Sequence, residues 1–226
     1  MNSIKKINDL DLFQGVSPEK MDMLIAQAAY KKYKRGEMII GEEDSIRSFY
    51  VVVSGQLKLY RSSPEGKEQT LQLLGPGDPF GLCTAFATDS FPASAMAIED
   101  ATVLLIPGTV VEMVAKQDPA ILFNIIKILS QRLKASMNLI ESLSLKEVPE
   151  RLASFLCHEL SRSMSDKKNT IELAISQREM AKILGATPEA LSRTLRKMAN
   201  DGILSTSGRV IFIMDRQALE KLAECD

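Results

Sequence analysis

The stretch SQREMAKILGATPEALSRTLRKMANDG, which starts at Ser176, constrains the fold of this chain more than any other segment. Ser176 and Glu179, three residues apart, form the capping-box pattern that starts a helix. Gly185 ends this helix, because a residue that tolerates positive φ closes a helix tightly. Thr187 and Pro188 then give a second helix its side-chain cap and a proline in its first turn. The sequence therefore predicts two helices joined by a tight turn.

The second helix is predicted to have one buried face and one polar, basic face. Leu191, Leu195 and Met198 recur at helical spacing and mark the buried stripe. The opposite face carries Ser192, Arg193, Arg196 and Lys197. Such a helix, with hydrogen-bonding side chains near its N-terminus and cations behind them, suits the major groove of DNA.

The side chains on this polar face are expected to divide into two roles. Arg193 can bind guanine through two hydrogen bonds, Glu189 can accept one from cytosine, and Ser192 lies between them. Arg196 and Lys197 sit further along the helix, where phosphates are the expected contacts. The sequence thus predicts that the first three residues read bases and that the last two hold the DNA backbone.

The segment ILSTSGRVIFIMD, which follows the helix pair, reads as two strands. They are predicted to turn at Ser207 and Gly208, with Arg209 at the tip, which completes a winged helix-turn-helix. The predicted DNA-binding residues are Thr187, Glu189, Ser192, Arg193, Arg196, Lys197 and Arg209. A solvated charged face, or a surface that docks a protein, remains an alternative interpretation.

The run QREMAKILGATPEALSRTLRKMANDGIL resembles the DNA-binding domain of the cyclic-AMP receptor protein and fumarate-nitrate reduction regulator family of bacterial transcription factors. The order Glu189, two residues, Ser192, Arg193 is similar to the fumarate-nitrate reduction branch, so the resemblance implies base-reading roles for these three. The cyclic-AMP branch has an Arg directly before the Glu, where this chain has Pro188. We therefore expect a half-site read differently from that of the cyclic-AMP receptor.

Length and composition indicate a globular protein of two domains, with 226 residues, 45% hydrophobic and 25% charged. The formal net charge is −1, so DNA affinity must come from local placement of cations and from a doubled site in a dimer. The N-terminus has no apolar segment of signal length and no aliphatic run is long enough to span a membrane, which predicts a soluble, cytoplasmic protein.

Histidine and cysteine usage argues against an enzyme. His158 is the single histidine, which excludes a Ser-His-Asp triad or a two-histidine zinc helix within one chain. The three cysteines, Cys83, Cys157 and Cys225, are far apart and form no CxxC pair, so neither a disulfide framework nor a cysteine-built metal site is expected. No metal site is assigned.

Residues 1–118 are predicted to form a β-roll sensor domain. A short helix over residues 17–30 is followed by strand-period segments at 49–53, 56–60, 69–74 and 101–106, separated by turns. The phrases YKRGEMII, FYVVVSGQLKLYR, GKEQTLQLLGPGDPFG and ATVLLIP resemble the jelly-roll sensor domain of the same family, in the same order. The predicted fold class is α+β.

Residues 119–146 are predicted to form a dimerisation helix and hinge. No proline or glycine interrupts the segment after Pro119, and apolar residues recur three or four positions apart, as in a coiled coil. The predicted seam is Leu122, Ile126, Leu129, Leu133, Ile140 and Leu143. A helix of this pattern could also pack wholly on its own β-roll. The hinge is expected near Pro149, and residues 147–226 form the winged helix-turn-helix domain.

The expected effector pocket lacks the charges that bind a cyclic nucleotide. Family members of that type carry a Glu for the ribose and an Arg for the phosphate, and the resemblance places Leu82 and Ala93 at these positions. A cyclic phosphate would be buried without a counter-charge, which costs several kcal/mol. The predicted pocket residues are Leu82, Cys83, Phe86, Phe91, Ser94 and Met96.

The identity of the effector is open at this point. An iron-sulfur cluster is excluded, because the oxygen-sensing branch builds it largely from N-terminal cysteines and this chain has none before Cys83. Haem is one candidate, since thiolate and thioether both bind haem iron, and its ligand would be Cys83, Met96 or His158. Some haem-dependent, nitric-oxide-responsive members of the family in anaerobes also lack the cyclic-nucleotide residues. Cys83 as a small buried hydrophobe is the alternative.

The combined prediction is a homodimeric transcription regulator that binds a palindromic site on double-stranded DNA in response to an effector. The resemblance also implies RNA polymerase as a partner, and no membrane contact is expected. The rival hypothesis is a β-roll that regulates a protein partner, with the winged helix as its docking surface.

Overall fold

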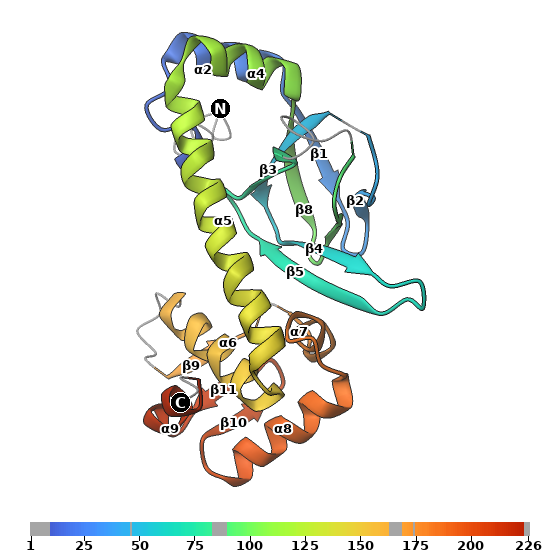
Figure 1. The fold of residues 1–226 in the computed structure, drawn as a ribbon, viewed down its shortest axis with the longest axis vertical. Coiled ribbons are helices and arrows are strands. Elements are labelled where there is room, and N and C mark those ends of the chain that lie inside the picture. The colour runs from blue at the N-terminus through green and yellow to red at the C-terminus, as the bar shows by residue number, and fades with distance from the viewer. Residues whose placement is uncertain (1–9, 46, 83–89, 163–168, 174, 224–226) are drawn as a thin grey trace. The chain divides into compact units, whose positions relative to one another are not determined.

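The computed structural model describes residues 10–45, 47–82, 90–162, 169–173 and 175–223, and it divides the chain into two compact units, Met1–Ala135 and Ser136–Asp226 (Figure 1). The boundary falls inside one long helix, α5 (Pro119–Leu145). Two of the predicted effector-pocket residues, Cys83 and Phe86, lie outside the described residues.

The first unit is built on two four-stranded antiparallel sheets among its described residues. One has the order β1-β8-β3-β6 and the other the order β2-β7-β4-β5. The strands of the first sheet are β1 (Ala29–Tyr33), β8 (Ala101–Pro107), β3 (Ser48–Ser54) and β6 (Pro79–Phe80). Those of the second are β2 (Met38–Ile40), β7 (Ser94–Ala97), β4 (Leu57–Ser62) and β5 (Glu68–Leu74). The predicted β-roll is confirmed.

The strand β3 shows why the first sheet has a continuous apolar sequence. Phe49 and Val51 pack into a core with the helices, whereas Tyr50 and Val52 face a second core shared with the other sheet. Both faces of the strand are therefore buried, and strict alternation of polar and apolar residues is not needed. Tyr50 stacks on Phe80 with ring centroids 4.8 Å apart.

Short helices cover one face of the first sheet, namely η1 (Asp11–Phe13), α2 (Pro18–Ala26), α4 (Gly108–Gln117) and the start of α5. The leading helix is shorter than predicted from residues 17–30, because the chain turns extended at Ala29. Strand β1 pairs with β8 over its whole length, from Ala29 opposite Leu105 to Tyr33 opposite Ala101. Pairing with β8 makes residues 29 and 30 extended, although the sequence pattern predicts a helix there.

Gly55 makes the tight connection between β3 and β4. It has φ +78°, and a Cβ built on it would lie 2.3 Å from the carbonyl oxygen of Asp100. Any side chain here would displace the backbone of the opposing turn. Across the following hairpin, Lys58 Nζ donates to Glu68 Oε2 at 2.8 Å.

The second unit contains the end of α5, four further helices among its described residues and a three-stranded sheet. The helices are α6 (Val148–Arg162), α7 (Gln177–Ile183), α8 (Pro188–Asn200) and α9 (Arg216–Ala223). The sheet has the order β10-β11-β9, with strands β10 (Leu204–Ser207), β11 (Val210–Ile213) and β9 (Thr170–Glu172). The predicted winged helix-turn-helix is confirmed, and so is the break in helix before Pro149.

The C-terminal helix α9 was absent from the sequence prediction. Asp215 caps it, with its Oδ1 accepting a hydrogen bond from the amide of Ala218 at 2.9 Å. Leu219 is fully buried in a unit whose core also includes Leu152 and Leu156 of α6, the helix that α9 packs against.

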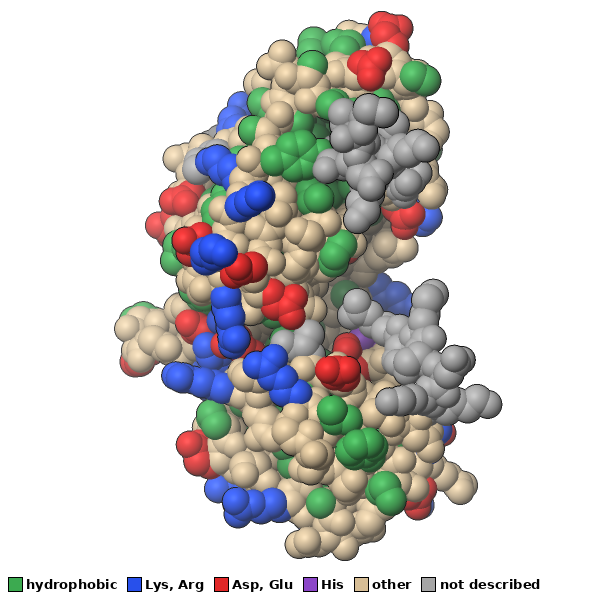
Figure 2. Space-filling view, turned by 180° about the vertical axis from the view of Figure 1, so that it is seen from behind, with side chains coloured by type: hydrophobic (Ala, Val, Ile, Leu, Met, Phe, Trp, Pro, Cys, Tyr) green, Lys and Arg blue, Asp and Glu red, His purple; other side chains and the backbone are tan. Residues whose placement is uncertain are grey.

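On the face displayed in Figure 2, Lys and Arg side chains are interspersed with Asp and Glu side chains. Within the described residues, no helix is long and apolar enough to span a bilayer.

Candidate DNA-binding surface and sensor region

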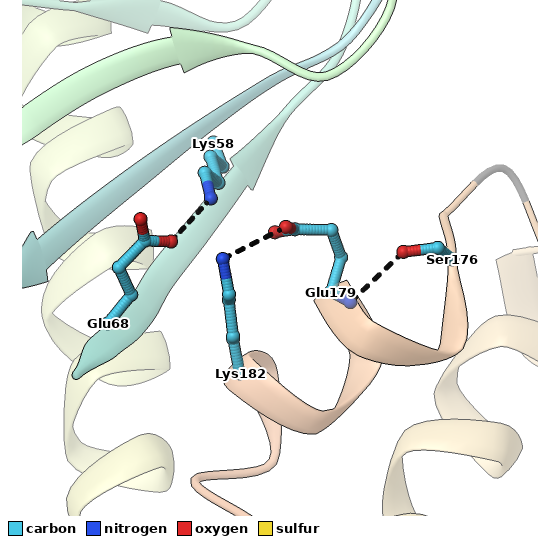
Figure 3. Close-up of polar contacts among 5 residues, drawn as sticks. All are labelled: Lys58, Glu68, Ser176, Glu179 and Lys182. Atoms are coloured by element: carbon cyan, nitrogen blue, oxygen red, sulfur yellow. Dashed lines mark hydrogen bonds and ion pairs between the residues drawn. The ribbon is translucent and has the colours of Figure 1, made fainter. Parts of the chain in front are cut away.

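The first helix of the pair, α7, begins as the sequence predicts. Ser176 Oγ accepts a hydrogen bond from the amide of Glu179 at 3.2 Å, which satisfies one of the free amides of the first turn (Figure 3). The Glu179 carboxylate accepts a hydrogen bond from Lys182 Nζ, also at 3.2 Å. The cap and this ion pair fix the start of the helix that supports α8.

Both helices end at a glycine with positive φ, Gly185 at 58° and Gly202 at 73°. After α7, the amide of Ala186 donates to Ala181 O at 2.9 Å, and after α8 the amide of Ile203 donates to Met198 O at 2.9 Å. These bonds, from the third residue past each helix back into its last turn, define a Schellman motif at each end. The turn between the helices is therefore fixed by backbone geometry.

The buried face of α8 contains Leu191, Leu195 and Met198, as predicted. Thr194 is buried with them, and its hydroxyl donates to Ala190 O at 3.0 Å, which satisfies it inside the helix. Thr187 caps the helix by accepting a hydrogen bond from the amide of Ala190 at 3.2 Å. One face of α8 is thereby anchored, and the rest of the helix faces outward.

The outward face of α8 presents the predicted side chains together. Glu189, Arg193, Arg196 and Lys197 are exposed, and Ser192 is half-buried. Spacings of three and four residues put them on one side of the helix. Within the described part of the chain, no hydrogen bond or ion pair engages the side chains of the three cations on this face. They remain available for an external partner.

The wing places a further cation at its tip. Ser207 pairs with Val210, so the turn consists of Gly208 and Arg209, one residue later than predicted. Gly208 has φ 61°, which a two-residue hairpin of this kind requires. Arg209 is exposed there.

Sequence reasoning overlooked one basic side chain, Arg178. It is exposed in the first turn of α7, on the opposite side of the helix from the buried Met180. The signal that could have found it was an arginine beside a helix cap, where a phosphate also meets free backbone amides. We add Arg178 to the candidate phosphate contacts.

The predicted effector residues lie in different surroundings. Leu82 is buried in the core that holds Leu104 and Ile106, whereas Phe91 is buried in the core between the sheets, with its ring edge toward Phe80 at 6.5 Å between centroids. The described residues thus place these two side chains in separate clusters. Ala93 is buried as well, so apolar atoms occupy both positions expected to carry charge in a cyclic-nucleotide site.

The other two described pocket candidates, Ser94 and Met96, lie on β7. Ala95 and Ala97 of this strand face the core between the sheets, so Ser94 and Met96 face the other way. Ser94 Oγ accepts a hydrogen bond from the amide of Glu42 at 3.0 Å. His158, the remaining candidate haem ligand, is exposed on α6. Among the described residues, no group of three His, Cys, Asp or Glu side chains could hold a metal ion.

The long helix α5 has a buried side and an exposed apolar side. Ile121 and Ile125 pack into the core of the first unit. The predicted seam residues Leu122, Ile126, Leu129, Leu133 and Ile140 are exposed, and Leu143 is half-buried. Phe123 and Met137, which the sequence prediction did not include, are also exposed, at 71% and 62%. An exposed apolar stripe of this length is the usual mark of an interaction surface.

Comparison with known proteins agrees with this arrangement. Residues 30–118 match the family described as cyclic nucleotide-binding domain, and residues 150–222 match the Crp-like helix-turn-helix domain. The chain is 30% identical to the anaerobic regulatory protein of Haemophilus influenzae, covering 90% of this chain and 79% of that protein. It is 28% identical to the cyclic AMP receptor protein of Thermus thermophilus, covering 94% and 96%.

A similar solved structure is that of FixK2 from Bradyrhizobium japonicum, with a TM-score of 0.78 and 30% identity over 88% of this chain and 98% of that chain. Both sensor and DNA-binding units are included in these matches, in the same order. The relatives are transcription regulators and not enzymes. The chain belongs to the Crp/Fnr family of DNA-binding transcription regulators.

Proposed function

We propose that this protein is an effector-responsive regulator that binds a two-fold symmetric DNA site as a homodimer, with α8 in the major groove. The observation that carries the proposal is the outward face of α8, where Glu189, Ser192, Arg193 and Arg196 share one side of a rigidly capped helix. Its three cations are not engaged within the described chain, so binding DNA would not break an ion pair of theirs.

Two kinds of contact follow from position along the helix. Glu189 and Arg193 lie in the first half of α8, where the N-terminal part of a recognition helix reaches base edges. Arg196, Lys197 and the wing residue Arg209 serve the phosphates, together with Arg178 of α7. The first set supplies discrimination between sequences, and the second supplies affinity that depends on salt.

The apolar stripe of α5 supports a homodimer. A second copy of the same helix, packed against this stripe, would cover Leu129, Leu133 and Ile140 with identical residues, as two-fold symmetry requires. Two copies of α8 would then face half-sites about one helical turn apart. The rival, in which α5 packs wholly on its own β-roll, does not account for these exposed side chains.

The effector that we infer is not a cyclic nucleotide, although the Thermus relative is named a cyclic AMP receptor protein. Leu82 and Ala93 are buried apolar residues and offer no charge to a phosphate. An uncharged aromatic ligand or haem remains a candidate.

Effector binding would shift the balance between two orientations of the DNA-binding units. RNA polymerase is the partner through which a dimer bound to DNA would act. Its place of action would be the cytoplasm, where bacterial DNA lies.

A salt series of DNA binding tests the proposal against the rival of a protein-docking winged helix. Groove binding with several phosphate contacts should weaken steeply as salt rises from 50 to 200 mM, by about 10³-fold or more for six contacts. A selected site should also retain its advantage over random DNA at each salt concentration. Binding that is weak, insensitive to salt and equal for all sequences would remove the proposal.

A further inference from the structure

The link between α5 and α6 is surrounded by a set of hydrogen bonds, most of them donated by a lysine or an arginine, which we call the hinge cluster. It consists of the side chains of Lys146, Arg151 and Ser154 and the carbonyl oxygens that they bind. The helix α5 ends at Leu145, and α6 begins at Val148, so Lys146 is one of two residues in the link.

Arg151 binds the end of α5 from the first turns of α6. Its Nη1 donates to Lys146 O at 3.1 Å and, more weakly, to Leu143 O at 3.5 Å. Carbonyls at the end of a helix lack partners within the helix and carry partial negative charge, so a guanidinium is a favourable cap. Arg151 therefore holds the last turn of α5 against α6.

Lys146 binds the end of a different helix. Its Nζ donates to Ala223 O, in the last turn of α9, at 2.8 Å, and to Ser154 Oγ at 3.2 Å. The Ser154 hydroxyl in turn donates to the same Ala223 carbonyl at 3.3 Å. The C-terminus of α9 is thereby capped by a cation that belongs to the hinge.

These contacts join three helix ends at one point. The link is only two residues long, and Glu150 Oε2 accepts a hydrogen bond from the amide of Glu147 at 2.6 Å, which fixes the backbone on its other side. Because the buried Leu219 anchors α9 in the core of the unit, the position of the Ala223 carbonyl is fixed. If Lys146 left, the Ala223 carbonyl would keep only the longer hydrogen bond from Ser154 Oγ, at 3.3 Å, and lose the one from Lys146, at 2.8 Å.

We propose that Lys146 is a positioning residue that fixes the angle between the dimerisation helix and the DNA-binding unit, and that it thereby sets the spacing of the two half-sites that a dimer accepts. This inference rests on the proposed function, because spacing has a meaning only for a dimer on a two-fold site. Lys146 lies outside the predicted DNA-reading residues, so its effect should fall on spacing and not on the half-site itself.

The test compares Lys146→Met with Lys146→Arg and with the control Lys134→Met. Lys134 is an exposed lysine on α5 that binds no other group within the described chain. The probes are a two-fold duplex selected by the wild type from random DNA, the same duplex with one base pair added or removed between half-sites, and a single half-site.

We expect the wild-type preference for the selected spacing to fall about tenfold in the Met variant, because this variant loses the charge-assisted hydrogen bonds of Lys146 to Ala223 O and Ser154 Oγ. Its binding to the single half-site should stay within about twofold. The Arg variant should recover much of the preference, and Lys134→Met should match the wild type. A Met variant that keeps the full wild-type preference would overturn the proposal.

A second measurement does not depend on DNA. Amide hydrogen exchange over residues 143–152 and 219–223 should become about fivefold faster in Lys146→Met and stay unchanged in Lys134→Met. Unchanged exchange in Lys146→Met would refute the hinge cluster even if DNA binding fails for other reasons. If exchange is faster in Lys146→Met but the wild-type protein selects no two-fold site, the hinge cluster holds and the proposed function is wrong.

Discussion

The hydroxyl oxygen of Thr187 lies 3.2 Å from the amide nitrogen of Ala190 and caps α8, the helix that carries the candidate base-reading residues. The cap fixes where this helix begins, and so the direction in which its first turn points. An N-cap of this kind contributes about 1 kcal/mol to stability.

The variant Thr187→Ala should therefore lower the free energy of unfolding by about 1 kcal/mol and weaken specific DNA binding. The variant Thr187→Ser keeps an oxygen at the same place and should restore both. Denaturant unfolding and DNA titration measure the two effects. If alanine and serine behave alike, the cap contributes nothing.

The apolar stripe of α5 gives a prediction on assembly. Leu133 is 64% exposed, and a charge placed there would be buried in a two-fold helix pair without a partner. Leu133→Lys should sediment as a monomer, whereas Asn138→Lys, exposed on the opposite side of the helix, should remain a dimer. A wild-type protein that sediments as a monomer at micromolar concentration contradicts the dimer.

Asp118 gives a prediction on pH. Its Oδ2 accepts a hydrogen bond from the amide of Ser17 at 2.9 Å, and its Oδ1 accepts one from Ala120 at 3.1 Å. These backbone donors hold the pKa of the Asp118 carboxyl below its ordinary value of 3.8. Since the folded pKa is the lower one, the stabilisation is complete above about pH 4 and is lost as the pH falls through the folded pKa.

The variant Asp118→Ala should thus melt below the wild type at pH 7, and the difference should shrink as the pH falls under 3.8. The exposed carboxylate Asp22 on α2 offers a matched control, Asp22→Ala. Melting curves of both variants from pH 3 to 7 check this. A difference that is independent of pH would assign the effect of Asp118 to something other than its charge.

The effector prediction follows from Leu82 and Ala93. With apolar side chains at both positions, cyclic AMP should bind no better than about millimolar, or roughly −4 kcal/mol. Calorimetry that shows micromolar binding would contradict this. Haem titration is the complementary measurement: a defined Soret band that changes in Cys83→Ala, Met96→Ala or His158→Ala would support haem, and diffuse binding unaffected by any of them would exclude it.

The sequence predicted local features of the second unit well, because each depends on a few neighbouring residues. Ser176, Gly185 and Thr187 determine caps and a turn by their own backbone and side-chain preferences, and the structure has all three. The break between α5 and α6 falls close to the predicted place, at residues 146–147, although Val148, the residue before Pro149, already belongs to α6. The helix α9 was missed although Asp215 and Leu219 carry an ordinary cap and core signal.

Long-range features were harder to predict. The start of β1 at Ala29 depends on pairing with β8, more than 70 residues away along the chain. Leu82 and Phe91 look alike as buried apolar residues, yet they belong to different cores, and only the sheet arrangement separates them. The hinge cluster requires Lys146 and Ala223 to meet, which no local pattern indicates.

The most direct test of the central claim is the base preference of Arg193→Ala. A site is first selected from random duplexes by the wild type, and each base pair is then varied in turn for both proteins. We expect Arg193→Ala to lose about 1 to 3 kcal/mol of discrimination at one position of each half-site, while Lys197→Ala weakens binding to all sequences alike. Equal losses on selected and random DNA for Arg193→Ala would contradict base reading by α8.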